Sequence, residues 1–97
     1  MGDEELAQIV MSGFLEETPG LFEELRRSLA AGDATGALRH VHTIKGASAN
    51  VGGEALRAAA LETEAAGHSG DLDAIIARVP GLESQFAQLM EAMRGLP

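Results

Sequence analysis

The pentapeptide HTIKG, residues 42–46, places a nucleophile, a cation and a position without a side chain within about one helical turn. A neutral imidazole, the main form of an exposed histidine at pH 7, can attack through one ring nitrogen without a separate base. Phosphoryl transfer suits such a group. A cation at i+3 can stabilise the spread negative charge, and a missing side chain at i+4 admits another active site. We therefore consider His42 a candidate phospho-acceptor, Lys45 a candidate for phosphoryl stabilisation and Gly46 a candidate access position.

The segment that carries these residues has the apolar spacing of a helix packed in a bundle. Its seam, at alternating gaps of three and four, consists of Ala34, Ala37, Val41, Ile44, Ser48 and Val51. The direction of this seam lies about 130° from His42, so we expect the imidazole to face solvent. Gly46 is expected to point outward and Lys45 to lie on the flank. An interior helical glycine costs on the order of 1 kcal/mol relative to alanine, which favours an access role for Gly46.

The chain before this segment is predicted to form two helices. Residues 3–17 carry a helical stripe made of Leu6, Ile9, Val10, Phe14 and Leu15. Thr18 has the residue type of an N-cap and Pro19 that of a first helical residue, so a second helix is predicted from there to Gly32. Asp33 is expected to cap the helix that contains His42.

The chain after it is predicted to form two more helices. Residues 50–53 supply a turn, the next helix fades at residues 67–70, and Asp71 is expected to cap the last one. Pro80 removes a backbone donor and predicts a kink or a new start. Connections of two to five residues favour antiparallel neighbours. The predicted fold is all-α: an up-and-down antiparallel four-helix bundle with an additional short N-terminal helix.

Composition narrows the possible functions. A chain of 97 residues fits one domain, and a net charge of -8 disfavours nucleic acid or an anionic membrane as partner. The chain has no cysteine, so it has neither a thiolate nucleophile nor a disulfide framework. No run of apolar residues approaches a membrane span and the acidic start is unlike a signal peptide, so we expect a cytoplasmic protein.

The sequence HTIKG, preceded by AAGDATGALRHV and followed by ASANVGG, resembles the H-x-x-K-G signature of histidine phosphotransfer (HPt) domains of bacterial two-component phosphorelays. The flanking stretches FLEETPGLFEELRRSLAAGD and EALRAAALETEAAGHSGDL also resemble helices of that family, so residues 1–97 are predicted to be a single HPt domain. The resemblance implies a phosphoprotein of signal transduction, with His42 as phospho-acceptor, Lys45 as the family's lysine and Gly46 as its small residue. His40 and Val41 depart from the small residues common before the histidine.

The resemblance also implies partners. These are response-regulator receiver domains, with which His42 would exchange a phosphoryl group on an aspartate, and a sensor or hybrid histidine kinase. Leu38 and Ala49 lie on the same side of the helix as His42, and Arg39 is well placed for docking; these three are the predicted docking residues. The protein is expected to be a monomeric phosphocarrier without ATP-dependent kinase activity, metal or cofactor of its own. Magnesium is expected to come from the receiver.

Other interpretations remain open. The chain could be the phospho-accepting module of a chemotaxis-type kinase, or a non-catalytic helical interaction module in which His42 is merely solvated. His40 and His68 are interpreted as structural or incidental, and Ser48 is expected to bond a carbonyl one turn back. The acidic side chains, among them Glu62 and Glu64, are predicted to be solvated rather than paired for acid-base chemistry.

Overall fold

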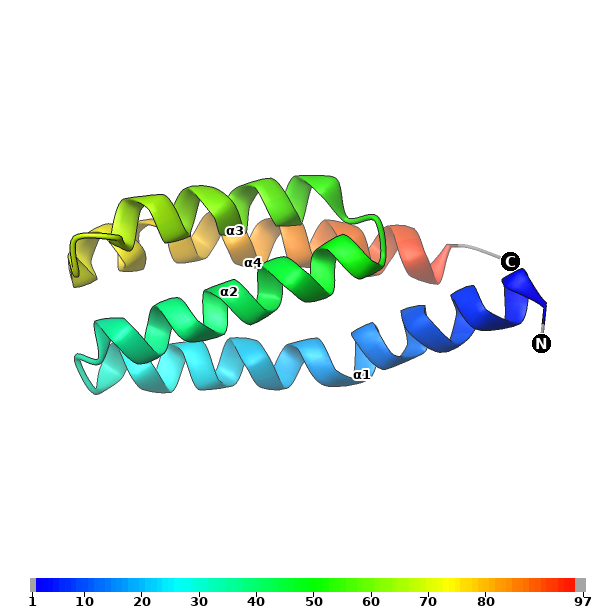
Figure 1. Cartoon of the computed structure of the whole chain (residues 1–97), viewed down its shortest axis with the longest axis horizontal. Coiled ribbons are helices and arrows are strands. Elements are labelled where there is room, and N and C mark those ends of the chain that lie inside the picture. The colour runs from blue at the N-terminus through cyan, green and yellow to red at the C-terminus, as the bar shows by residue number, and fades with distance from the viewer. Residues whose placement is uncertain (1, 96–97) are drawn as a thin grey trace.

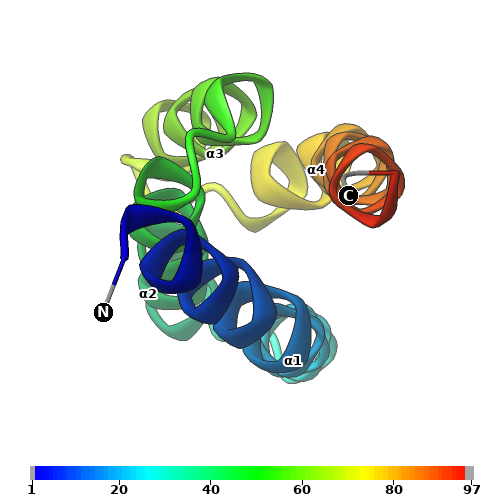
Figure 2. The ribbon, with the colours of Figure 1, turned by 90° about the vertical axis from the view of Figure 1, so that its right-hand side faces the viewer.

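The computed structural model describes residues 2–95 and consists of four helices without strands in that range. They are α1 (Asp3–Ala30), α2 (Ala34–Asn50), α3 (Glu54–Gly67) and α4 (Leu72–Arg94). The chain reverses direction at each short connection (Figure 1). Viewed end-on, α2 lies between α1 and α3, and α4 lies beside α3 (Figure 2). The predicted all-helical fold is confirmed. The predicted domain over residues 1–97 includes residues 1, 96 and 97, which lie outside the described ones, and it stays a prediction.

The helix that carries His42 begins and ends at the predicted turn residues. The Asp33 side chain accepts a hydrogen bond of 2.9 Å from the backbone N–H of Gly36 and so caps α2. At the other end, Gly52 adopts a φ of +69°, which favours glycine, and the N–H of Gly53 donates to the Ser48 carbonyl at 2.8 Å. Hydrogen bonds and backbone conformation within a few residues therefore fix both ends of α2.

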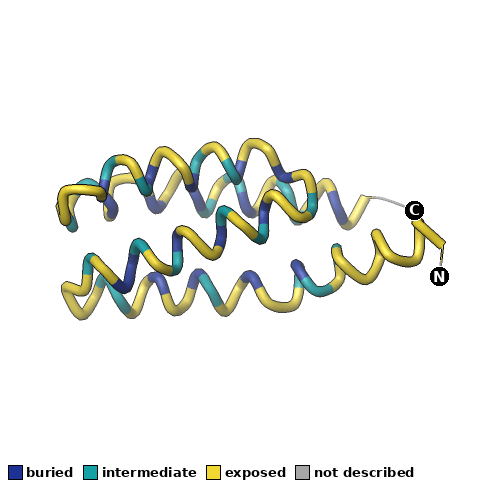
Figure 3. The backbone as a smooth tube through the Cα atoms, viewed as in Figure 1, coloured by how far each residue is buried: buried dark blue, intermediate teal, exposed yellow. Residues whose placement is uncertain are grey.

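The predicted seam of α2 lies in the core. Ala37, Val41 and Ile44 are fully buried, and Ala34 and Val51 at the two ends are half-buried. The buried Ser48 hydroxyl donates to the Ile44 carbonyl at 2.6 Å, which confirms the bond predicted for it. The burial of this seam sets the rotation of α2 about its own axis, and Figure 3 shows buried and exposed residues alternating along the helix.

Aromatic rings connect α1 and α4, the first and last helices of the chain. Phe86 of α4 stacks on Phe22 of α1, with ring centroids 4.9 Å apart, and meets Phe14 edge-on at 5.8 Å. All three rings are buried. These three rings therefore form the part of the core that lies between α1 and α4.

The predicted break at Thr18 and Pro19 is absent, because α1 continues through both residues. The prediction of a separate short N-terminal helix is therefore wrong for the described residues. The reason lies in how α1 packs on the core. Thr18 is only 1% exposed, and the buried face of α1 continues across it from Phe14 to Phe22. A proline removes one intrahelical hydrogen bond, whereas a break here would separate a continuous core surface. Figure 1 shows α1 changing direction near its middle instead of ending.

Pro80 likewise does not start a new helix. α4 runs unbroken from Leu72 to Arg94, with Val79 and Leu82 buried on either side of the proline. The Asp71 side chain caps α4 by accepting from the Ala74 N–H at 3.1 Å, which confirms the predicted start. Burial again outweighs the local cost of the proline.

The first turns of α1 extend past the other helices (Figures 1 and 3). Leu6, Ile9 and Val10 are 53%, 55% and 37% exposed, so this part of the predicted helical stripe lies at the surface. Val10 still borders a hollow that Ala47 and Asn50 of α2 also line. Throughout residues 2–95, no helix combines the length and apolar character needed to cross a membrane.

A substitution at Gly67 tests how closely α3 approaches its neighbours. A methyl group there would lie 2.6 Å from Cγ1 of Ile75 and 2.8 Å from Cδ2 of Leu38. We expect Gly67→Ala to lower the free energy of unfolding in urea by about 1–3 kcal/mol, because the neighbours must move. Gly81→Ala is the matched control. Open space surrounds that position inside α4, so alanine should raise stability by about 0.5–1 kcal/mol. Stabilisation by both substitutions would contradict the close approach.

Candidate functional site

His42 projects from the middle of α2 into solvent. Its side chain is 69% exposed, whereas its neighbour Val41 is fully buried. The expectation that the imidazole faces water is therefore confirmed. Gly46, one turn further along, is exposed as well, and a Cβ built there would meet no atom within 4 Å. The surface beside the ring is open on that side.

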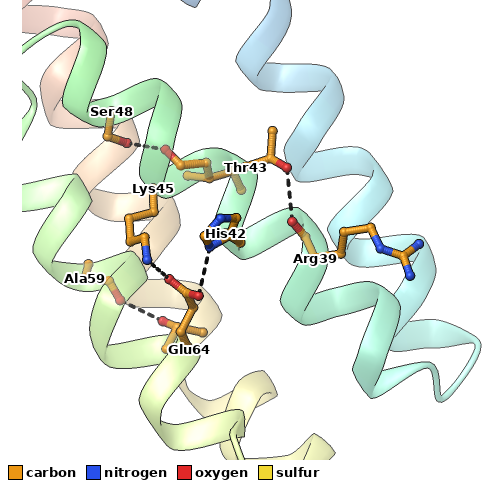
Figure 4. Close-up of polar contacts among 9 residues, drawn as sticks. Arg39, His42, Thr43, Lys45, Ser48, Ala59 and Glu64 are labelled. Atoms are coloured by element: carbon orange, nitrogen blue, oxygen red, sulfur yellow. Dashed lines mark hydrogen bonds and ion pairs between the residues drawn. The ribbon is translucent and has the colours of Figure 1, made fainter.

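A carboxylate from α3 joins the two polar residues of the HTIKG segment (Figure 4). Oε2 of Glu64 lies 3.1 Å from Nδ1 of His42, and Oε1 lies 2.6 Å from Nζ of Lys45. The side chains of Glu64 and Lys45 are each 25% exposed. The prediction that Glu64 is simply solvated is wrong, because the packing of α3 on α2 brings it to the site.

The position of Glu64 follows from the buried face of α3. Leu56, Ala60 and Thr63 are buried, and Glu64 comes one turn after Ala60 at the edge of that face. The Thr63 hydroxyl donates to the Ala59 carbonyl at 2.8 Å and needs no partner from α2. The sequence could have indicated that Glu64 lies near another helix, because it is a charged residue beside a buried stripe. The sequence does not indicate which residue of α2 the carboxylate contacts.

The electrostatics of the site keep Glu64 ionised. Burial raises the pKa of Glu64, but the hydrogen bonds and positive charges of Lys45 and His42 lower it by more, so the net shift is downward. Oε1 is inaccessible to solvent, and the Lys45 ammonium is its partner within the described residues. At neutral pH the carboxylate is therefore an acceptor for both α2 side chains.

A shallow hollow lies next to this cluster, between α2 and α3. Leu38, half-buried, lines it together with Leu61, Glu64, Ala65 and His68. Leu61 is 48% exposed and apolar. Of the predicted docking residues, Leu38 is thus the one that adjoins the carboxylate.

The remaining predicted residues lie further from the cluster. Arg39 is exposed and its side chain points away from His42 (Figure 4), while Ala49 is exposed on the same helix. His40 is half-buried and makes no polar contact with the cluster of His42, Lys45 and Glu64. Within residues 2–95, no group of three or more histidine or acidic side chains could hold a metal ion.

Comparison with known families identifies the chain. The family described as Hpt domain matches residues 10–95, so the chain belongs to the Hpt domain family, which confirms the resemblance of its sequence. Hpt domains are histidine-containing phosphotransfer modules of phosphorelays, phosphocarriers rather than kinases, and they interact with response-regulator receivers and kinases. Neither the curated proteins nor the solved structures gave a significant match.

The lowered pKa of Glu64 predicts a pH-dependent contribution to stability. A carboxyl whose pKa is lower in the folded state stabilises the fold above its unfolded pKa of about 4.3, and this contribution is lost as the pH falls through the folded pKa. We expect Glu64→Gln to lower stability by on the order of 1 kcal/mol at pH 7. The difference from wild type should shrink below about pH 4, as measured by urea denaturation across the acidic range.

Glu62→Gln provides the control for this measurement. Glu62 is on the same helix, its side chain is 69% exposed, and it contacts Arg78 at 3.4 Å. Its substitution should change stability by less than about 0.5 kcal/mol at every pH. A Glu64→Gln deficit that stays constant down to low pH would contradict the ionised role of Glu64.

Proposed function

We propose that His42 is the phospho-acceptor of this Hpt domain, taking a phosphoryl group from the aspartyl phosphate of one receiver and passing it to another. The supporting observation is the 69% exposed imidazole within the matched segment. Its Nδ1 contacts Glu64, while Nε2 has no partner among the described residues. An uncommitted ring nitrogen in solvent is what a phosphoryl acceptor requires.

The transfer is a displacement at phosphorus. The lone pair of the ring nitrogen forms the N–P bond, the P–O bond to the aspartate breaks, and the aspartate leaves as a carboxylate. Passage to the next receiver is the reverse reaction on another aspartate. Lys45 contributes a positive charge beside the ring, and Gly46 leaves room for the receiver's active site. Magnesium comes with the receiver, and the Hpt domain needs no cofactor of its own.

The receiver covers the exposed side of α2 and the adjoining edge of α3. Leu38 offers apolar surface there, and Ala49 allows close approach because its side chain is short. Arg39 lies at the edge of this surface and can meet an acidic partner. The up-and-down bundle, acting as a cytoplasmic monomer, holds His42 while donor and acceptor receivers exchange. A histidine kinase is the alternative donor.

The three histidines of the chain allow a direct test. The purified protein is incubated with a receiver phosphorylated by radiolabelled phosphate, and base-stable, acid-labile label is measured. We expect His42→Gln to abolish labelling, because no imidazole remains at the exposed position. His40→Gln and His68→Gln serve as matched controls and should label as wild type does. Undiminished labelling of the His42 variant would disprove the assignment.

The access role of Gly46 is tested by filling the space beside the ring. Gly46→Leu adds a side chain where nothing lies within 4 Å, so the fold should gain about 0.5–1 kcal/mol from better helix propensity. We expect phosphotransfer from the receiver to slow by roughly tenfold or more, because a bulky group beside the reacting atoms hinders their alignment. Unchanged transfer rates in a more stable variant would show that this space is not used.

A further inference from the structure

The first turns of α1 carry apolar side chains that the bundle leaves uncovered. Leu6 and Ile9 are 53% and 55% exposed, and Val10 beside them is 37% exposed. Spacings of three and four residues place these side chains on one face of the helix. Single exposed apolar residues are ordinary on a protein surface, whereas a contiguous row of them on a projecting helix indicates a contact surface.

This row continues into the hollow between α1 and α2. Val10, Phe14 and Leu21 line the hollow from α1, and Ala47 lines it from α2. From Leu6 to Leu21 the apolar surface follows α1 for about 22 Å, at about 1.5 Å per residue. The exposed row and the hollow together are called the α1 face below. Its length and shape suit a helix of about four turns lying along it.

The surroundings of the α1 face are acidic. Glu17 lines the hollow itself, and Thr43 and Asn50, which line it from α2, are uncharged. The first lysine or arginine of the chain is Arg26. The acidic side chains of this half of α1 are all exposed and form no ion pair within residues 2–95; they are Asp3, Glu4, Glu5, Glu16 and Glu17. An apolar row with unpaired carboxylates around it is complementary to a basic partner.

We propose that the α1 face binds a basic amphipathic helix of another protein, distinct from the receiver that meets His42. Apolar side chains of that helix, spaced three and four residues apart, cover Leu6, Ile9 and the hollow. Lysine or arginine side chains on its flanks meet the carboxylates of α1. This inference does not depend on phosphorylation, because neither His42 nor Lys45 lines the hollow.

The two partners approach α2 from different sides. α2 lies between α1 and α3 (Figure 2). Thr43 lines the hollow on the side of α1, whereas its neighbour His42 contacts Glu64 of α3. The basic helix therefore lies beside the phosphotransfer site without covering the imidazole.

Size and charge disfavour other occupants of the α1 face. A helix about 10 Å wide along about 22 Å covers a few hundred Å², whereas a stable interface buries about 800 Å² on each partner. A second copy of this chain would in addition bring two net charges of -8 and two acidic helix ends together. The same carboxylates repel an anionic membrane. The occupant is therefore a short basic helix that binds weakly and reversibly.

A synthetic peptide serves as the probe. It has about 16 residues, with leucine at helical spacings of three and four and lysine on both flanks. It is titrated into the full chain labelled with nitrogen-15, and we expect the amide signals of residues 6–14 and 43–50 to shift. Ile9→Ser should weaken binding about tenfold, because it removes a buried apolar contact. Ile76→Ser, which changes a 45% exposed isoleucine on α4, is the matched control and should bind as wild type does.

The charge argument is tested in the same titration. Glu17→Gln should weaken binding by roughly threefold at low ionic strength, and the difference should vanish at about 1 M salt. Glu23→Gln, an exposed site of α1 outside the hollow, should leave the affinity unchanged. A peptide with glutamate in place of lysine should not bind. Equal binding of the two peptides, or equal affinity of wild type and Ile9→Ser, would overturn the proposal.

Two further outcomes would assign the α1 face to a different occupant and thereby also overturn the proposal. The first is a wild-type dimer in analytical ultracentrifugation that Ile9→Ser abolishes, which would show that a second copy binds there. The second is a lysine peptide that does not bind, together with a receiver whose phosphotransfer Ile9→Ser slows. Because the titration uses no phosphoryl group, its result is independent of whether His42 is the phospho-acceptor.

Discussion

The packing of α2 against α3 determines every feature of the candidate site. Fully buried residues on both helices set how each is rotated, and this rotation turns His42 outward while bringing Glu64 to its ring. The three polar groups come from two segments 22 residues apart in sequence. Helix propensity alone would form the two helices without bringing these three groups together. The hydrophobic effect itself is not directional. Because side chains repeat at a fixed angle along a helix, however, burying the apolar residues also fixes where the polar residues point.

The parts of this arrangement that depend on one helix could be predicted from the sequence. Residues advance by about 100° along a helix, so a seam of small and apolar residues gives the direction of every other side chain. That argument placed His42 in solvent and Ser48 in the core. The capping residues Asp33 and Asp71 were equally predictable, because their bonds span only three positions.

The parts that depend on two helices could not be predicted. Which residue of α3 meets His42 depends on the relative height and rotation of two helices, and no local pattern contains that information. Pro19 is another residue whose structural role could not be predicted from local sequence alone. Its local preference for a helix start is weaker than the continuous burial of Phe14, Thr18 and Phe22, which becomes visible only when the opposing helices are in place.

The charge of the molecule also has to be considered at the scale of the site. A net charge of -8 would oppose the approach of a phosphorylated partner if it acted as a whole. At physiological ionic strength, however, charges are screened over about 8 Å, so the nearest groups matter most. There the carboxylate of Glu64 is balanced by Lys45 at 2.6 Å. The surroundings of His42 in this acidic protein can therefore be locally close to neutral.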